Sequence, residues 1–290
     1  MLYSCLESMT KKSLLISGLV VATIVVVTAR VIFLPRHHAK MRFANVSLGH
    51  PAYEAVIGRG LSWLQQPSAD VKPFQWLLIN YLQRKFALDP ALSASRELPP
   101  QTEGEAARYQ VYHRIIAPND LPSSLPLADE APVDQMVMMA MHCDHIALPA
   151  HFDQLVSRSI AAGGYSLTHA ALSLQRLREN GCSLPGDQIN KLRQRATTSI
   201  AATVGDKGPQ SDWGYEAVAL LFDSGRRDLV RPSWIAQIAQ QQQADGHWGG
   251  SVGTNGNDHT TVLALWAVLA FTHPNAPNEP MLRPPVALTP

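Results

Sequence analysis

The chain has 290 residues, with 24 lysine and arginine residues against 23 acidic ones, and its formal net charge at pH 7 is +1. This length suffices for one large domain with additional segments. Because no run of basic residues alternates with aromatic ones, the clustered basic face that binds a phosphate backbone is excluded, and we expect no nucleic-acid partner.

The first predicted element is an apolar run at residues 14–34. Roughly twenty helical residues span the ~30 Å hydrocarbon core of a membrane, and no small-residue cleavage site follows the run. We therefore expect an N-terminal tail at residues 1–12, an uncleaved transmembrane anchor at 13–34 and a connector at 35–50.

The orientation of this anchor has two conflicting signals. More basic residues end or follow the run than precede it, and by the positive-inside rule this places the body in the cytoplasm. A short tail with Lys11 and Lys12 before an apolar run is instead typical of a bacterial signal anchor. We expect a single-pass protein of the bacterial inner membrane with a periplasmic body, and a cytoplasmic body is the alternative.

Helical patterning fills most of residues 51–273, which we predict to be one all-α domain. Within residues 51–86, Pro67 and Pro73 mark a break between two helices. Prolines then punctuate residues 89–132, which we expect to form an excursion with one short helix near 105–116. The Pro-rich tail at 274–290 has too little apolar content to pack strongly.

After residue 132, amphipathic helices alternate with helices that are apolar nearly all round, and glycines separate them. The predicted helices are 133–142, 152–162, 165–180, 187–203, 213–223, 232–243 and 259–272. A helix that is apolar on every side must be buried on every side, so the alternation predicts outer and inner helices. Three such pairs follow one another, which is typical of stacked two-helix repeats.

The most specific motif is the segment 240–248, Gln-Gln-Gln-Gln-Ala-Asp-Gly-His-Trp, with Asp-His-Thr-Thr at 258–261 opening the next apolar helix. It resembles the Gln…Gly-x-Trp signature of the terpenoid cyclase and protein prenyltransferase superfamily, whose fold is an (α/α) toroid. The resemblance is strongest over residues 231–272. It implies stacked helical hairpins in an incomplete toroid, and a structural role for the glutamine and tryptophan of the turn.

The same resemblance bears on zinc. The Asp-His-Thr-Thr stretch is similar to a segment of prenyltransferase β subunits whose histidine is a zinc ligand. The aspartate-rich motif of the cyclases and the Asp-x-Cys pair of the prenyltransferase zinc site are both absent from this chain. The resemblance therefore implies a fold and neither of the two reactions.

Three polar residues, His169, Glu216 and His259, occupy equivalent places near the starts of three predicted inner helices, at offsets of 47 and 43 residues. If the repeats stack, all three share one rim. Two histidines and a carboxylate suit Zn²⁺ with an open position for water, so we predict a zinc site with Glu216 as its catalytic residue. The alternative is that each is an ordinary polar residue at a helix end.

A second cluster, His142-Cys143-Asp144-His145, offers two histidines three residues apart. We expect His145 to be a further zinc ligand, although a dense cluster of this kind also arises by chance. Asp144 is equally suited to cap a turn.

The cysteine count limits covalent cross-linking. Cys5, Cys143 and Cys182 allow one disulfide at most, and their spacing matches no metal or redox motif. We expect small, buried or unreactive thiols.

Two functions fit these features. The first is a metal-dependent hydrolase or lyase with zinc on the rim of the helical array. The second is a non-catalytic module that docks a peptide, a lipid or a partner subunit at the membrane. The converging histidines favour the first, whereas the anchor, the Pro-rich excursion and the missing acid motif favour the second.

Overall fold

A computed structural model describes residues 50–66, 71–89, 112–120, 132–249 and 257–283, together with residues 92, 106, 109, 110 and 125. The chain divides into two units, Met1–Ala44 and Asn45–Pro290, and the described residues all belong to the second. The transmembrane anchor predicted at 13–34 lies outside them. No helix in the described part of the chain is long and apolar enough to cross a membrane.

The described residues form α-helices and short 3₁₀ turns without a strand, which confirms the all-α prediction. The α-helices are α2 (His50–Leu64), α3 (Pro73–Phe86), α6 (Pro132–Met141), α7 (Phe152–Ala162), α8 (Gly164–Glu179), α9 (Gln188–Val204), α10 (Asp212–Asp223), α11 (Pro232–Gln240) and α12 (Asn257–Thr272). Seven were predicted after residue 132, and most of their ends agree within two residues. The exception is α11, which ends three residues early.

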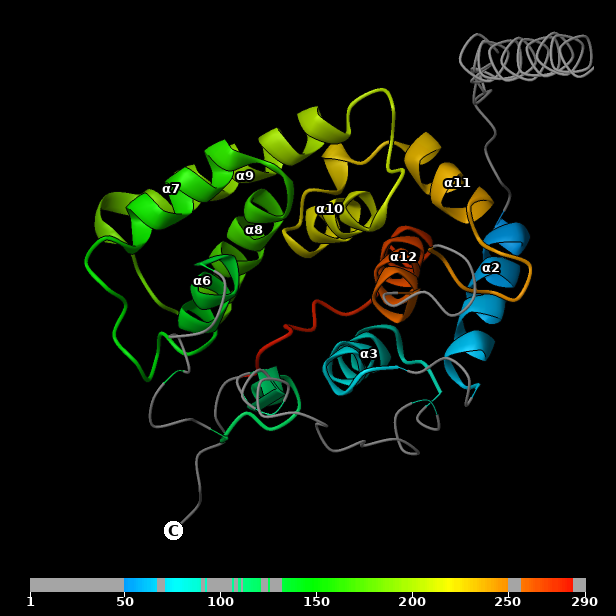
Figure 1. The fold of residues 1–290 in the computed structure, drawn as a ribbon, viewed down its shortest axis with the longest axis horizontal. Helices are drawn as coiled ribbons and strands as arrows, with labels where there is room; N and C mark the ends of the chain where they lie inside the picture. Colours follow the sequence, from blue (N-terminus) through cyan, green and yellow to red (C-terminus); the bar gives the residue numbers. More distant parts are fainter. Residues whose placement is uncertain are drawn as a thin grey trace, which may run out of the picture. The chain divides into compact units, whose positions relative to one another are not determined.

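The helices of this unit lie in two layers, as Figure 1 shows. Helices α7, α9, α11 and α2 are on the outside, and α6, α8, α10, α12 and α3 face the centre. Along the inner layer α6 packs on α8, α8 on α10, α10 on α12, and α12 on α3. The predicted alternation of outer and inner helices is therefore observed.

The N-terminal hairpin packs beside the C-terminal one. Helix α12 contacts both α2 and α3, and all its residues from Asn257 to Ala270 are buried except His259. A side chain at Gly60 of α2 would place its Cβ 2.8 Å from the side chain of Leu265. Glycine at this position is what allows the two helices to approach so closely.

A turn from the Pro-rich excursion joins the two ends of the inner layer. The 3₁₀ helix η2 (His113–Ile115) packs against α3. Its Arg114 is fully buried and donates to the carbonyl oxygen of Met141 at the end of α6, at 2.5 Å. The same guanidinium forms a two-pronged ion pair with Asp144, at 2.6 and 2.5 Å. Asp144 therefore secures this junction.

The turn between α11 and α12 has the predicted structural role. Trp248 is fully buried, and its indole nitrogen donates to the carbonyl oxygen of Ile238 in the preceding helix at 2.7 Å. The side-chain amide of Gln242 donates to the carbonyl oxygens of Val56 in α2 and Gly246, both at 2.9 Å. Gly246 has a φ of 106°, which favours glycine, and any Cβ there would overlap the backbone of α2.

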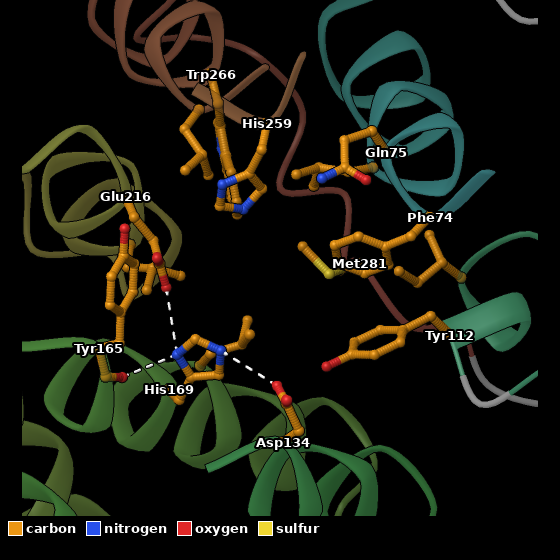
Figure 2. Close-up of a pocket in the computed structure, with 15 residues that line it drawn as sticks. Phe74, Gln75, Tyr112, Asp134, Tyr165, His169, Glu216, His259, Trp266 and Met281 are labelled. Atoms are coloured by element: carbon orange, nitrogen blue, oxygen red, sulfur yellow. Dashed lines mark hydrogen bonds and ion pairs between the residues drawn. The ribbon is translucent and has the colours of Figure 1, made fainter. Parts of the chain in front are cut away.

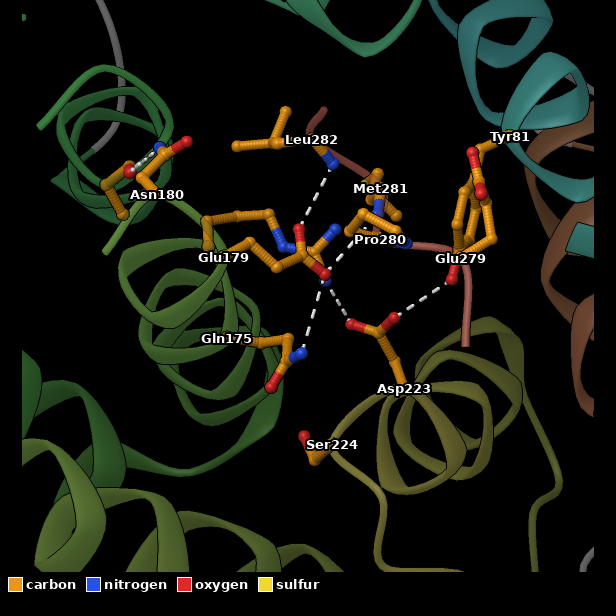
Figure 3. Close-up of polar contacts among 12 residues, drawn as sticks. Tyr81, Gln175, Glu179, Asn180, Asp223, Ser224, Glu279, Pro280, Met281 and Leu282 are labelled. Atoms are coloured by element: carbon orange, nitrogen blue, oxygen red, sulfur yellow. Dashed lines mark hydrogen bonds and ion pairs between the residues drawn. The ribbon is translucent and has the colours of Figure 1, made fainter. Parts of the chain in front are cut away.

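The expectation that the C-terminal tail packs weakly is wrong for its first part. Met281 and Leu282 are buried, and their backbone N–H groups donate to the Glu179 carboxylate at 3.3 and 3.1 Å (Figure 3). On the other side, Arg84 of α3 donates to Met281 O at 3.1 Å and pairs with Glu279 at 3.2 Å. Hydrogen bonds between the tail backbone and the side chains of Glu179 and Arg84 therefore hold this segment in place, although it has few apolar side chains.

A buried ionic network lies beside this tail. The fully buried Arg176 pairs with Asp223 and, at 3.3 Å, with Glu179. Tyr81 donates to the other oxygen of Asp223 at 3.2 Å (Figure 3). Burial raises the pKa of Glu179, opposed by Arg176 and by the backbone N–H groups of the tail.

The cysteine expectation also needs correction, because Cys143 and Cys182 form a disulfide. Their Cα atoms are 6.1 Å apart across 39 residues of sequence. The packing of α6 on α8 brings them together, with Asn180 donating to the carbonyl oxygens of Ala140 and Met141 at 3.0 and 2.8 Å. Thus at least two of the three cysteines are not free thiols.

Candidate functional site

The inner helices surround a pocket with a volume of about 300 Å³, shown in Figure 2. Each inner helix contributes a polar residue from its first two turns, and Met281 of the tail reaches the pocket from another side. The polar and aromatic lining residues are Phe74, Gln75, Tyr112, Asp134, Tyr165, His169, Glu216, His259 and Trp266. The remaining wall is aliphatic, so a polar rim surrounds an otherwise apolar cavity.

His259 opens the buried helix α12 and is oriented by a carboxylate. Its Nδ1 lies 3.0 and 3.1 Å from the two oxygens of Asp212, at the start of α10. A carboxylate only accepts hydrogen bonds, so Nδ1 carries the proton and Nε2 is the basic nitrogen. Asp212 also accepts from Thr260 and Tyr165, each at 2.7 Å, which ties the starts of three successive inner helices together.

This pairing shifts both pKa values. Burial lowers the pKa of His259, but the hydrogen bond to Asp212 and the charges of Asp212, Glu216 and Asp258 outweigh it and raise the pKa above the ordinary value. Burial raises the pKa of Asp212, and the bonds from His259, Thr260 and Tyr165 bring it below its usual range. The pair is therefore an ionised carboxylate holding an imidazole with enhanced basicity.

His169 lies between two carboxyl groups. Its Nδ1 is 2.8 Å from the carbonyl oxygen of Tyr165, one turn earlier in α8, and 3.6 Å from Oε1 of Glu216. Its Nε2 is 3.6 Å from Asp134, the third residue of α6. This arrangement places two acidic groups and two imidazoles around one cavity (Figure 2).

Glu216 is the most deeply buried acid of the pocket, with an exposed fraction of 5 %. Burial raises its pKa, and the charges of His169 and His259 oppose this only in part. Its Oε2 is buried and has no hydrogen-bond partner. Glu216 therefore keeps its proton to a higher pH than an ordinary glutamic acid does. Its Oε2 atom is available to accept or donate a further hydrogen bond.

Two more polar atoms of the lining have no partner. Oε1 of Gln75 and the indole N–H of Trp266 are both buried without a hydrogen bond. An unpaired buried polar group costs about 1–3 kcal/mol, and three of them around one cavity are uncommon in a native core.

The predicted trio His169, Glu216 and His259 therefore lines one pocket, as the alignment of the repeats indicated. His145 does not join them, because it is exposed in the turn after α6 and is not part of the lining.

Gln75, Asp134 and Asp212 are site residues that the sequence reasoning missed. Gln75 and Asp134 are each the third residue of an inner helix, as His259 is. Extending the repeat alignment to the two earlier inner helices would have found them.

Zinc has no support from the described geometry. Within the part of the chain that the structure describes, no three side chains of histidine, cysteine, aspartate or glutamate lie close enough together to hold a metal ion. The zinc site of His169, His259 and His145 stays a prediction.

Comparison of the chain with known protein families, with curated proteins and with solved structures finds no significant match.

Proposed function

We propose that the central pocket is the active site of an acid–base enzyme, a hydrolase or lyase, that acts on a small molecule carrying a positive charge. The observation that carries the proposal is the convergence of His169, Glu216 and His259 from three separate helices on one cavity, with Oε2 of the buried Glu216 left unpaired. Shifted carboxyl and imidazole pKa values in one pocket are typical of catalytic sites.

The roles follow from the geometry and from the directions in which the pKa values are shifted. His259, oriented by Asp212, offers Nε2 as the base that removes a proton from water or from a substrate carbon. Glu216, whose pKa is raised by burial, is the acid that donates a proton to the leaving group. In hydrolysis the hydroxide formed adds as the leaving group departs. In elimination the C–H electrons form the double bond, and the leaving group departs with the proton of Glu216.

The preference for a cation rests on the charges and rings of the lining. Asp134 and Glu216 supply acidic groups, and the lining contains no lysine or arginine among the described residues. The aromatic side chains of Phe74, Tyr112 and Trp266 add apolar contact and are of the kind that attracts cations. A volume of about 300 Å³ is at the small end of ligand sites, which favours a small molecule over a peptide.

The fold and location form part of the proposal. Two layers of paired helices around a pocket support the (α/α) toroid that the sequence resemblance implied. The disulfide Cys143–Cys182 supports a body outside the cytoplasm, since such bonds persist in oxidising compartments such as the periplasm. With the anchor at residues 13–34, we place the enzyme on the periplasmic face of a bacterial inner membrane.

The test is substrate profiling of the full chain. Purified protein is incubated with the small-molecule fraction of a bacterial extract, and mass spectrometry identifies compounds that are consumed and formed. We expect a cationic compound to be converted by wild type and by His145→Asn, the matched histidine outside the pocket, but not by His259→Asn or Glu216→Gln. No conversion by wild type, or equal conversion by the pocket variants, would contradict the proposal.

A further inference from the structure

A second pocket differs from the first because arginine side chains line it. It has a volume of about 470 Å³ and lies where α8, α9 and the end of α10 meet. Arg178 of α8, Arg193 of α9 and Arg226 after α10 all line it, and no acidic residue does so among the described ones. Three guanidinium groups in one pocket repel one another, and an anion between them would relieve the repulsion.

Two of the three arginines have hydrogen-bonding capacity left. The guanidinium of Arg178, an exposed residue, makes no hydrogen bond or ion pair within the described residues. Arg193 donates through Nη2 to Gln175 and to the carbonyl oxygen of Ser224, both at 3.1 Å, but its buried Nε–H has no partner. An unpaired buried N–H on a charged group is the second, independent sign of a missing acceptor.

The third arginine is already neutralised. Arg226 binds Asp228 through two bonds of 2.9 and 2.8 Å and donates to the buried hydroxyl of Thr197 at 3.2 Å. Burial lowers the pKa of Arg193, and repulsion from Arg178 and Arg226 lowers it further, with Asp223 opposing. Two positive charges, those of Arg178 and Arg193, therefore remain without a partner in the pocket.

We propose that this pocket binds a phosphate group. A phosphate monoester carries about −1.5 to −2 charges at pH 7, which matches the two uncompensated arginines better than the single charge of a carboxylate. The fork of a guanidinium suits its oxygens in a bidentate way. Ser224, whose hydroxyl makes no bond to another described residue, adds an uncharged donor. The source is either a soluble phosphate compound or a lipid headgroup.

The test is calorimetric titration of the full chain with two probes. One is inorganic phosphate and the other is dihexanoylphosphatidic acid below its micelle-forming concentration. We expect saturable binding at one site per chain. Equal affinity for both probes indicates that the phosphate group alone is recognised, and tighter binding of the second indicates a lipid source.

Two variants connect the binding to the pocket. Arg178→Gln removes a guanidinium that makes no described bond, so the fold is expected to persist, and affinity is expected to fall about tenfold or more. Arg158→Gln on α7 is the matched control, because Arg158 is an exposed arginine outside the pocket. If Arg178→Gln changes the circular dichroism spectrum, Arg178→Lys is used instead. It keeps the positive charge and tests only the contribution of the planar guanidinium group. Absence of saturable binding of either probe, or binding that Arg178→Gln and Arg158→Gln weaken equally, would overturn the proposal.

Discussion

Nδ1 of His259 lies 3.0 Å from Oδ1 of Asp212, although 47 residues separate the two in the chain. The carboxylate opens one inner helix and the imidazole opens the next, so their bond depends on the stacking of successive hairpins. The same carboxylate accepts from Tyr165 at the start of a third helix. Asp212 therefore both ties the rim of the pocket together and sets the orientation of the proposed base.

Replacing Asp212 by Asn should lower the pKa of His259, because the carboxylate is the main group that raises it. The change is measured by NMR titration of the imidazole, assigned by comparison with His259→Asn. Asp206→Asn is the control, since Asp206 is almost fully exposed beside Arg231. An unchanged His259 titration in Asp212→Asn would refute the pairing.

The same variant should change the pH dependence of stability. A histidine with a raised folded-state pKa stabilises the fold below its unfolded pKa of about 6.5 and loses this contribution as the pH rises through the folded value. The stability difference between wild type and Asp212→Asn should therefore be larger at pH 6 than at pH 9. Thermal denaturation at the two pH values provides the measurement.

Glu216→Gln should separate stability from function. Because burial raises the pKa of Glu216, its ionisation disfavours the fold as the pH rises above the unfolded value of about 4.5. The neutral isostere is expected to be as stable as wild type at pH 4 and equally or more stable at pH 8, while activity is lost. A variant markedly less stable than wild type at pH 8 would show instead that Glu216 is a structural acid.

Removing one partner of the buried network should be costly. Arg176→Met leaves Asp223 and Glu179 buried with their charges uncompensated, and we expect a loss of about 3–5 kcal/mol in the free energy of unfolding. Adding Asp223→Leu should recover part of that loss. Chemical denaturation of both variants checks this, with the exposed pair Arg231–Asp206 as the control. A loss for Arg176→Met no larger than that for Arg231→Met would contradict the assignment.

Breaking the disulfide should destabilise the body. Cys143→Ser is expected to lower the free energy of unfolding by about 2–5 kcal/mol, since the bond joins two residues that are 39 positions apart in the sequence. Dithiothreitol should lower the melting temperature of wild type but not that of Cys143→Ser, and Cys5→Ser should behave as wild type. Alkylation of Cys143 without reductant would argue against the bond.

Local patterning was a reliable guide to the helices and to part of the site. Glycine and proline positions set the helix ends, and the apolar character of α12 required burial on all sides. The alignment of repeats then brought His169, Glu216 and His259 to one pocket. These inferences depend on periodicity within each segment, and sequence displays such periodicity directly.

The remaining features depend on contacts between distant segments, which no local pattern displays. The pairing of Arg114 with Asp144 joins the excursion to α6, and Glu179 anchors a tail whose composition suggested weak packing. The disulfide likewise requires the register of α6 against α8. His145 was expected in the site because it is near other histidines in the sequence, but the turn after α6 directs it elsewhere.

The most direct test of the central pocket is a calorimetric titration of the full chain with 2-phenylethylamine, using phenylacetate as the anionic counterpart. We predict that the amine binds and the acid does not. Glu216→Gln should bind the amine about tenfold more weakly or worse, because an amide NH2 group replaces a carboxyl oxygen that can accept a hydrogen bond from the ammonium group, whereas His145→Asn should match wild type. Equal binding of the acid and the amine, or full affinity of Glu216→Gln for the amine, would contradict the account.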